Sequence, residues 1–352
     1  MRAARGRYIS VPNVGYGTWA PEDPSWCTQA VVDALQAGVR HLDCAWEYGV
    51  GSLTINLLGE GIRLSGVPRE EIFFTSKFWP NFASPDNVPL ALDKILDAMG
   101  LDYLDLFLAH FPVALKPLPE LNGAVNFVGA TPQHQRCAED ERGQYVPDLF
   151  HCPRAVAGLN GSPEGGTFVP TWEAMKELVR AGKCRAIGVS SFERAHLEEI
   201  LAHASHTDVP ISCNQIEAHP WYPNTDLVNF LHDQGILPTI YSPFAPKTFT
   251  VQNGVVEGFE FAPAGVKLLD EPIVRAVAKK NAMDAGQVLQ SWAVQRGTVP
   301  LAKSRSKTRI ASNLAVRWLS AEDQRLLNSL EKDRFSGKSI DVNLLFPGVR
   351  MR

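Results

Sequence analysis

Six cysteines are scattered along the 352 residues, and no two of them form a C-x-x-C pair. This absence argues against a structural zinc site and favours free thiols in a reducing compartment. We therefore expect a cytoplasmic protein that holds no metal ion. A disulfide between Cys137 and Cys152, which lie in one long loop, is the alternative that the sequence leaves open.

The chain also lacks a strong excess of charge and any long apolar run. Its net charge of −4 leaves no basic footprint, which argues against nucleic acid or an anionic membrane as partner. No apolar run approaches the roughly 18–20 residues that cross a bilayer. The start, MRAARGRYIS, has three arginines but no apolar segment of a secretory signal. A composition of 45% hydrophobic and 20% charged residues is typical of a globular protein.

Short β-rich runs alternate with segments of helical periodicity along most of the chain. Eight such runs are followed by helices, without a change of composition that would mark a linker. Repeated βα units predict a parallel sheet, and eight of them predict a closed (β/α)8 TIM barrel, with extra helices, in one α/β domain over residues 1–352. The alternative is an open doubly wound sheet, which needs a Gly-rich phosphate loop after its first strand. GYGTWAPED offers only G-x-G, without a third glycine.

Several helix starts are marked by residues that cap helices. Ser190 and Glu193 have the spacing of a capping box. Asp270 and Asp284 precede two further helical segments, and Ser320 precedes the last one.

Every predicted strand ends on a polar residue. The eight residues are Thr18, Asp43, Lys77, His110, Ser190, Gln215, Ser242 and Lys303. In a barrel the active site lies at the carboxyl ends of the strands. One polar strand end could be a structural group, but a ring of eight is better explained by a single shared site.

Eight stretches resemble the aldo-keto reductase family, and together they cover roughly residues 11–335. They are VGYGTWA, HLDCAWEYG, FTSKFW, LAHFP, GKCRAIGVSSF, NQIEAHPW, YSPF and LAKSRSKTRIASN. The resemblance implies reduction of an aldehyde or ketone to an alcohol by NADPH. It also implies a catalytic tetrad at Asp43, Tyr48, Lys77 and His110.

The chemistry of these four residues is consistent with that role. A free tyrosine has a pKa near 10, too high for an efficient proton donor at neutral pH. A nearby ammonium favours the phenolate, so we expect Lys77 to lower the pKa of Tyr48. Asp43 would hold Lys77 in place, and His110 would orient the substrate oxygen.

A cofactor must supply the hydride, because no side chain can. The resemblance implies a nicotinamide cofactor extended across the barrel mouth. Its contacts would come from Gly17, Thr18, Trp19, Ser190, Ser191, Gln215, Tyr241, Ser242, Lys303, Ser304, Arg309 and Asn313. In the family pattern, Tyr241 stacks on the nicotinamide, and Ser190 and Gln215 hold its carboxamide.

The basic segment over residues 303–309 bears on whether the cofactor is NADPH or NADH. Lys303, Ser304 and Arg309 match the family's residues that bind the adenosine 2′-phosphate, and the resemblance implies that Asn313 reaches the adenine. Arginine can bind phosphate with two hydrogen bonds, which favours NADPH over NADH. The alternative is that Lys303, Arg305, Lys307 and Arg309 form only a solvated basic edge.

The sequence departs from the family pattern at three places. Ser191 replaces an asparagine that contacts the carboxamide, and Ser312 replaces a glutamate beside the adenine. Val50 and Gly51 replace an Asn-Glu pair that supports the tyrosine loop.

The loop from Val113 to Pro170 is unusually long and rich in Gly and Pro. Because it follows His110, we expect it to lie over the site and shape the substrate pocket, although a surface insertion is the alternative. Trp46, Trp79, Phe111 and Trp221 would line an apolar pocket that suits an apolar or aromatic carbonyl substrate. They could also be simple packing. Residues 336–352 form a C-terminal tail.

Two other functions stay open. One is a cofactor-binding regulatory subunit without turnover, and the other is a sugar or polyol reductase, which would want a more polar pocket. The sequence makes no prediction of oligomeric state.

Overall fold

The computed structural model describes residues 1–19, 24–46, 48, 52–117, 137–138, 141, 146–148, 150–152, 166–203, 208–245, 247–252, 255–261, 267–332 and 338. Eight parallel strands form a closed barrel in the order β1-β10-β7-β6-β5-β4-β3-β2. Their bounds are β1 Gly15–Gly17, β2 His41–Asp43, β3 Phe73–Phe78, β4 Leu104–Ala109, β5 Cys184–Ser190, β6 Cys213–Glu217, β7 Leu237–Tyr241 and β10 Val299–Ala302. The predicted TIM barrel is therefore confirmed, and the open sheet is excluded.

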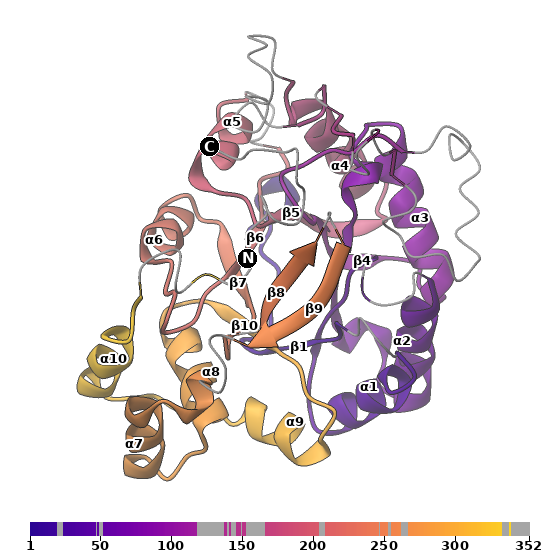
Figure 1. Ribbon diagram of the computed structural model, residues 1–352. Helices are drawn as coiled ribbons and strands as arrows, with labels where there is room; N and C mark the ends of the chain where they lie inside the picture. Colours follow the sequence, from indigo (N-terminus) through magenta and orange to yellow (C-terminus); the bar gives the residue numbers. More distant parts are fainter. Residues whose placement is uncertain are drawn as a thin grey trace.

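Helices surround the barrel (Figure 1). They are α1 Cys27–Gln36, α2 Ser52–Ser65, α3 Asn87–Met99, α4 Val169–Arg180, α5 Arg194–Leu201, α6 Thr225–Asp233, α7 Pro272–Lys280, α8 Ala285–Gln295, α9 Lys307–Leu314 and α10 Ala321–Asn328. Helix α3 illustrates the pattern, because Leu92, Ile95, Leu96 and Met99 are buried along one side. It ends where Gly100 adopts a left-handed conformation, with φ of 64°. None of the described helices is long and apolar enough to cross a membrane.

Two of the predicted helix caps are confirmed. Asp284 and Gln287 form a capping box at α8, and Ser320 accepts the backbone N–H of Asp323 at α10.

The other two predicted caps are wrong. Glu193 rather than Ser190 caps α5, with His196 as its capping-box partner, because Ser190 is still the last residue of β5. Helix α7 begins at Pro272, and Asp270 lies in the 3-10 turn before it.

The interior of the barrel is closely packed. Gly188 in β5 shows how closely, because a Cβ atom there would collide with the backbone oxygen of Cys213 on β6 and with Leu108 on β4. The side chains of Leu106 and Leu108 are buried between the strands. The barrel is therefore a filled core, and a ligand can reach only its ends.

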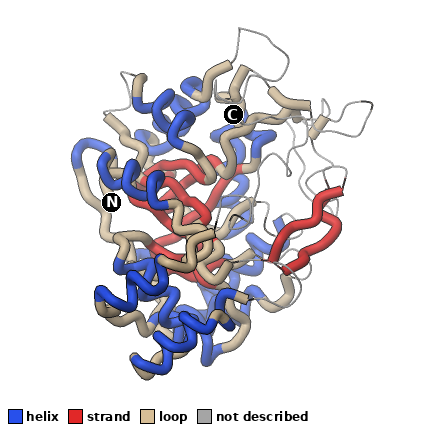
Figure 2. Tube along the Cα trace, turned by 60° about the vertical axis from the view of Figure 1, so that its left-hand side comes forward, coloured by secondary structure: helices blue, strands red, loops and turns tan. Residues whose placement is uncertain are grey.

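The two ends of the barrel carry different coverings. At the amino ends of the strands, Ala3 and Ile9 pack on Phe73 and Leu106. At the other end lies an antiparallel hairpin, β8 Lys247–Gln252 and β9 Val255–Phe261, which the sequence analysis did not predict. Figures 1 and 2 together place the N-terminus and this hairpin on opposite sides of the barrel.

The described parts of the loop after β4 contribute buried residues to the hydrophobic core and bond to one another. The backbone N–H of Lys116 donates to Val146 at 2.9 Å, and Pro117 forms a β-bridge with Cys137. Cys137 and Cys152 are buried and unlinked, as are the other four cysteines, so the disulfide alternative is wrong. The rest of residues 113–170, and all of 336–352 except Lys338, lie outside the described residues, so their predicted roles stay predictions.

Candidate active site

Three of the four predicted catalytic residues are in direct contact. The ammonium of Lys77 donates to Asp43 Oδ1 at 2.8 Å and to the Tyr48 hydroxyl at 3.0 Å. The side chains of Lys77 and Asp43 are 0% and 3% exposed. Strands β2 and β3 are adjacent and parallel, which brings their carboxyl ends together. Tyr48 follows β2 and keeps part of its surface exposed, so a substrate can reach it.

The ion pair is held from several sides. Lys77 also donates to the carbonyl oxygen of Cys44 at 2.9 Å, and Asp43 Oδ2 accepts from Gln215 Nε2 at 2.8 Å. The Thr18 hydroxyl fixes the backbone below by donating to the Asp43 carbonyl at 2.8 Å. A buried pair is stable when its remaining hydrogen-bonding groups are satisfied, and removal of one partner costs about 3–5 kcal/mol. The ion pair therefore holds the Lys77 ammonium in a fixed position beside the Tyr48 hydroxyl.

The pKa of Tyr48 differs from the sequence-based expectation. Burial raises it well above the ordinary value of 10.0, and the negative charge of Asp43 raises it further. The pKa of the resting phenol is therefore raised rather than lowered as predicted, because burial and the charge of Asp43 outweigh the effect of Lys77. Tyr48 is a neutral phenol across the neutral pH range, with its proton in place to donate.

His110 completes the group from the end of β4. Its ring lies 5.9 Å from the Tyr48 ring and 5.6 Å from the Trp79 ring, between centroids. Burial and the charge of Lys77 hold its pKa well below 6.5, so the imidazole is neutral. Its Nδ1 is buried without a hydrogen-bond partner among the described residues. A neutral imidazole carries one N–H donor, which suits a carbonyl oxygen placed beside Tyr48.

Aromatic side chains surround His110. Phe111 stacks on it at 4.6 Å, and Trp79 meets Phe111 edge-on at 5.6 Å. Trp46 lies in the loop after β2, close to Tyr48 in the sequence. Its backbone N–H donates to the carbonyl oxygen of Lys77 at 3.1 Å. The structure does not bring Trp221 to this group, because Trp221 packs in a separate cluster and donates to Glu271 at 2.9 Å.

The residues expected around the nicotinamide lie on β5, β6 and β7. Ser190 is buried and faces Gln215 in register. Ser191 follows with a positive φ of 62°, and its hydroxyl lies 3.4 Å from that of Tyr241. Ser242 also has a positive φ, of 55°. Strand β6 pairs with β5 on one side and with β7 on the other, so the three strand ends are adjacent.

The basic segment after β10 has the donors that a phosphate needs. Arg309 Nε donates to the Ser304 hydroxyl at 3.2 Å, which orients the guanidinium. Lys303 and Arg305 are exposed beside it. Three cations and a hydroxyl in one short segment fit a phosphorylated ribose. Gly17 and Trp19 lie across from this segment at the end of β1, and the Trp19 carbonyl accepts from Lys303 at 3.0 Å.

The predicted adenine end lies on α9. Asn313 is partly exposed there, and its carbonyl accepts from Gln290 at 3.5 Å. Ser312, which stands where the family pattern has glutamate, hydrogen-bonds to Asp284 instead. Val50 and Gly51 lie outside the described residues.

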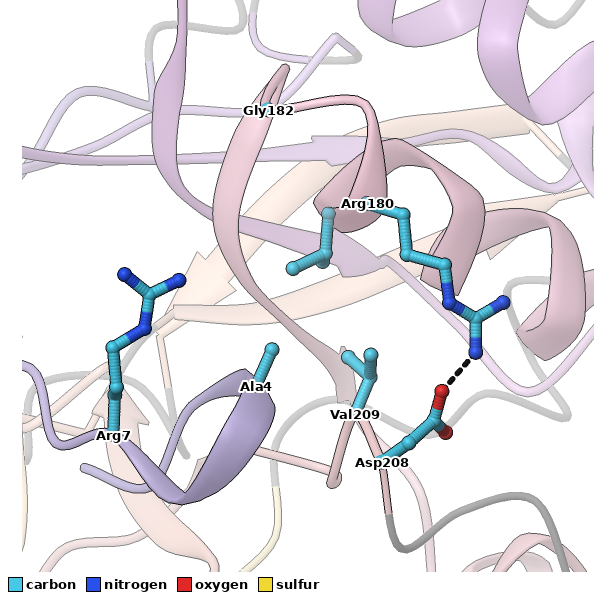
Figure 3. Close-up of a pocket in the computed structure, with 7 residues that line it drawn as sticks. Ala4, Arg7, Arg180, Gly182, Asp208 and Val209 are labelled. Carbon is cyan, nitrogen blue, oxygen red and sulfur yellow. Dashed lines mark hydrogen bonds and ion pairs between the residues drawn. The ribbon is translucent and has the colours of Figure 1, made fainter.

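A cavity of about 460 Å³ lies at the opposite end of the barrel (Figure 3). Its lining comes from the N-terminal segment, the end of α4 and the loops before β5 and β6, with an ion pair between Arg180 and Asp208 at one side. The cavity is therefore separate from the tetrad. Among the described residues, no group of His, Cys, Asp and Glu could hold a metal ion.

Comparison with known proteins agrees with this geometry. The sequence model of the Aldo/keto reductase family matches residues 13–332. The chain belongs to this family. This aldo/keto reductase is an NADP-dependent oxidoreductase that reduces a carbonyl group.

Three relatives show the range of names within the family. A glycerol 2-dehydrogenase (NADP(+)) of Saccharomyces cerevisiae is 35% identical, over 95% of this chain and 91% of its own. An aldehyde reductase of the same yeast is 34% identical, over 95% and 91%. An NADPH-dependent D-xylose reductase of Meyerozyma guilliermondii is 33% identical, over 91% of both chains.

Sequence reasoning missed two features of this aldo/keto reductase. The contact of Gln215 with Asp43 joins residues 172 positions apart, and no local pattern indicates it. The contacts of Trp26 with Lys303 and Arg305 likewise join distant parts of the chain.

Proposed function

We propose that Tyr48 is the acid that protonates the carbonyl oxygen of the substrate, with Lys77 and Asp43 as its support. His110 orients that oxygen. The observation that carries the proposal is the continuous set of contacts from Asp43 through Lys77 to the Tyr48 hydroxyl, with His110 beside the same ring.

In the proposed step, one proton passes from Tyr48 to the substrate. NADPH supplies the hydride that reduces the carbonyl carbon. The O–H bond of Tyr48 breaks, and its proton passes to the substrate oxygen, which becomes the alcohol. The phenolate that remains accepts a hydrogen bond from Lys77, whose ammonium is already 3.0 Å away. The lysine thus stabilises the charge that appears during the reaction, which is the most effective kind of catalytic interaction.

The cofactor would be held by the residues at the strand ends. Tyr241 offers an aromatic face for the nicotinamide, with Ser190, Ser191 and Gln215 beside it. The cations after β10 would bind the 2′-phosphate. These assignments rest on the match of the donor set to the group and on family membership.

We further propose an apolar or aromatic aldehyde or ketone as substrate. The aromatic rings of Trp79 and Phe111 around His110 support this choice, because such rings bury apolar surface. A sugar or polyol reductase is the second candidate, and the names of the glycerol and xylose relatives favour it. The loop 113–170 would cover this pocket. Six buried free cysteines support a reducing, cytoplasmic compartment.

The test is the rate of NADPH oxidation with three substrates: benzaldehyde, dihydroxyacetone and D-xylose. We expect the largest kcat/KM for benzaldehyde. A larger value for either polyol-type substrate would overturn the apolar assignment in favour of the second candidate. Tight NADPH binding without turnover of any carbonyl would instead indicate a regulatory subunit.

A further inference from the structure

The indole of Trp26 lies within cation–π distance of two basic side chains. Its ring centroid is 5.9 Å from the Lys303 ammonium and 5.0 Å from the Arg305 guanidinium carbon. Trp26 directly precedes α1, whereas both cations follow β10. One aromatic ring from the start of the chain therefore contacts two charges from near its end.

The two cations are held differently. Lys303 has further contacts with Trp19, whose ring centroid is 5.2 Å away and whose carbonyl oxygen is 3.0 Å away. Arg305 is exposed, and its aromatic contact among the described residues is with Trp26. Like charges on neighbouring side chains repel, so each tends to swing into solvent. The negative face of the indole opposes this tendency and keeps both cations at the barrel rim.

We propose that Trp26 is a positioning residue that presents Lys303 and Arg305 to the 2′-phosphate, and so strengthens the preference for NADPH over NADH. The proposal rests on the cofactor assignment above. Long basic side chains lose conformational entropy when they bind a phosphate. A ring that already restricts them reduces that loss, and the gain applies only to a cofactor that carries the 2′-phosphate.

Trp26 also packs partly against the hydrophobic core, so a purely structural role must be separated from this one. A phenylalanine at this position retains an aromatic face, whereas a leucine retains only apolar volume. Cation–π attraction needs the aromatic face, and core packing does not. The pair Trp26→Phe and Trp26→Leu therefore distinguishes the two roles.

Isothermal titration of the full-length protein with NADP+ and with NAD+ tests the proposal. For Trp26→Leu, we expect the Kd for NADP+ to rise about 5-fold, the size of one to two cation–π contacts, while the Kd for NAD+ stays within about 2-fold. Trp26→Phe should recover most of the NADP+ affinity. Arg305→Gln should weaken NADP+ selectively as well, and Trp318→Leu, at a tryptophan that is 79% exposed, should change neither Kd.

Equal losses for the two cofactors would overturn the proposal, as would a Trp26→Phe variant no better than Trp26→Leu. Unchanged affinity in Trp26→Leu would overturn it too. Thermal unfolding of each variant without cofactor shows whether a loss comes from misfolding, and the Arg305→Gln titration still decides in that case. If the unmodified protein itself shows no preference for NADP+, the cofactor assignment fails, which is a different result.

Discussion

Gln215 donates its side-chain amide to the carboxylate of Asp43, with Nε2 and Oδ2 2.8 Å apart. Lys77 occupies the other carboxylate oxygen. Two donors on two oxygens fix the plane of the carboxylate, and the plane in turn fixes the direction of the lysine. The residue expected to hold the nicotinamide carboxamide thus also supports the catalytic pair.

Replacement of Gln215 by leucine should affect the protein before any cofactor binds. The Oδ2 atom of Asp43 would lose its donor, and an unsatisfied buried acceptor costs about 1–3 kcal/mol. We expect urea unfolding of the cofactor-free protein to show this loss, together with a lower kcat. Gln215→Glu should be worse, because it places a second carboxylate against Asp43. Full stability of Gln215→Leu, with only weaker NADPH binding, would leave the carboxamide contact as its sole role.

Tyr48→Phe should abolish most of the reduction and spare the cofactor. Loss of the proton donor is expected to lower kcat/KM about 10²- to 10⁴-fold. Binding of NADP+, measured by titration, should change little, since the phenol reacts with the substrate. Tyr8→Phe is the control, because Tyr8 is 78% exposed. Appreciable turnover by Tyr48→Phe would show that another group supplies the proton.

The double variant Lys303→Ala, Arg309→Ala tests the 2′-phosphate site. Each hydrogen bond to a charged group contributes about 1.5–3 kcal/mol, so loss of both side chains should weaken NADPH binding at least about 100-fold. NADH binding should fall only slightly. Lys307→Ala is a matched control, because Lys307 pairs with Asp33 at 3.2 Å. Equal losses for both cofactors would contradict the assignment and support a solvated basic edge.

Ser191→Asn should raise both the stability of the protein and its affinity for NADP+. Ser191 has a φ of 62°, in the left-handed region that asparagine tolerates well. We expect the free energy of unfolding to rise by up to about 1 kcal/mol. The added amide also restores the family pattern beside the carboxamide, so NADP+ should bind more tightly. Ser191→Ala should shift stability in the opposite direction, and a stabilising alanine would refute the backbone argument.

The buried histidine His41 should make the protein sensitive to acid. Burial lowers its pKa from 6.5 to about 3, with a smaller effect from Lys77. Between these two values the unfolded chain binds a proton that the folded chain does not, so stability is full above pH 6.5 and falls as the pH drops toward 3. The slope for one such group is about 1.4 kcal/mol per pH unit.

His41→Gln provides the comparison, because glutamine can still hydrogen-bond to Thr75, which lies 3.1 Å from His41 Nε2. Urea unfolding between pH 7 and 4.5 should show a smaller loss of stability in the variant. If the free energy of unfolding fell equally with pH in both proteins, the lowered pKa of His41 would be contradicted.

The barrel and the ring of polar strand ends could be predicted because both depend on local pattern. A charged residue at or next to the end of a β-rich run, such as Asp43 or Lys77, is visible in a single stretch of sequence, and parallel strands align such positions. The pKa of Tyr48 could not be predicted in the same way. It depends on how much protein surrounds the phenol and on how close the carboxylate of Asp43 lies, and both are tertiary properties.

Other differences have equally physical causes. Serine often caps helices, which is why Ser190 was expected to do so. Pairing with β6 extends β5 through Ser190, so Glu193 caps the helix instead. Trp221 resembles the other mouth tryptophans in the sequence alone. Its hydrogen bond to Glu271 holds it in another cluster.

The barrel closes where β1 meets β10, and the contacts at this seam bridge distant parts of the chain. The Tyr16 hydroxyl donates to the Ser304 carbonyl at 2.6 Å across 288 positions, and Lys303 reaches Trp19 across 284. A ligand that binds residues on both sides of this seam stabilises the closed barrel. Its occupancy should slow the transient opening through which proteases attack, so the loaded enzyme would outlast the empty one during digestion.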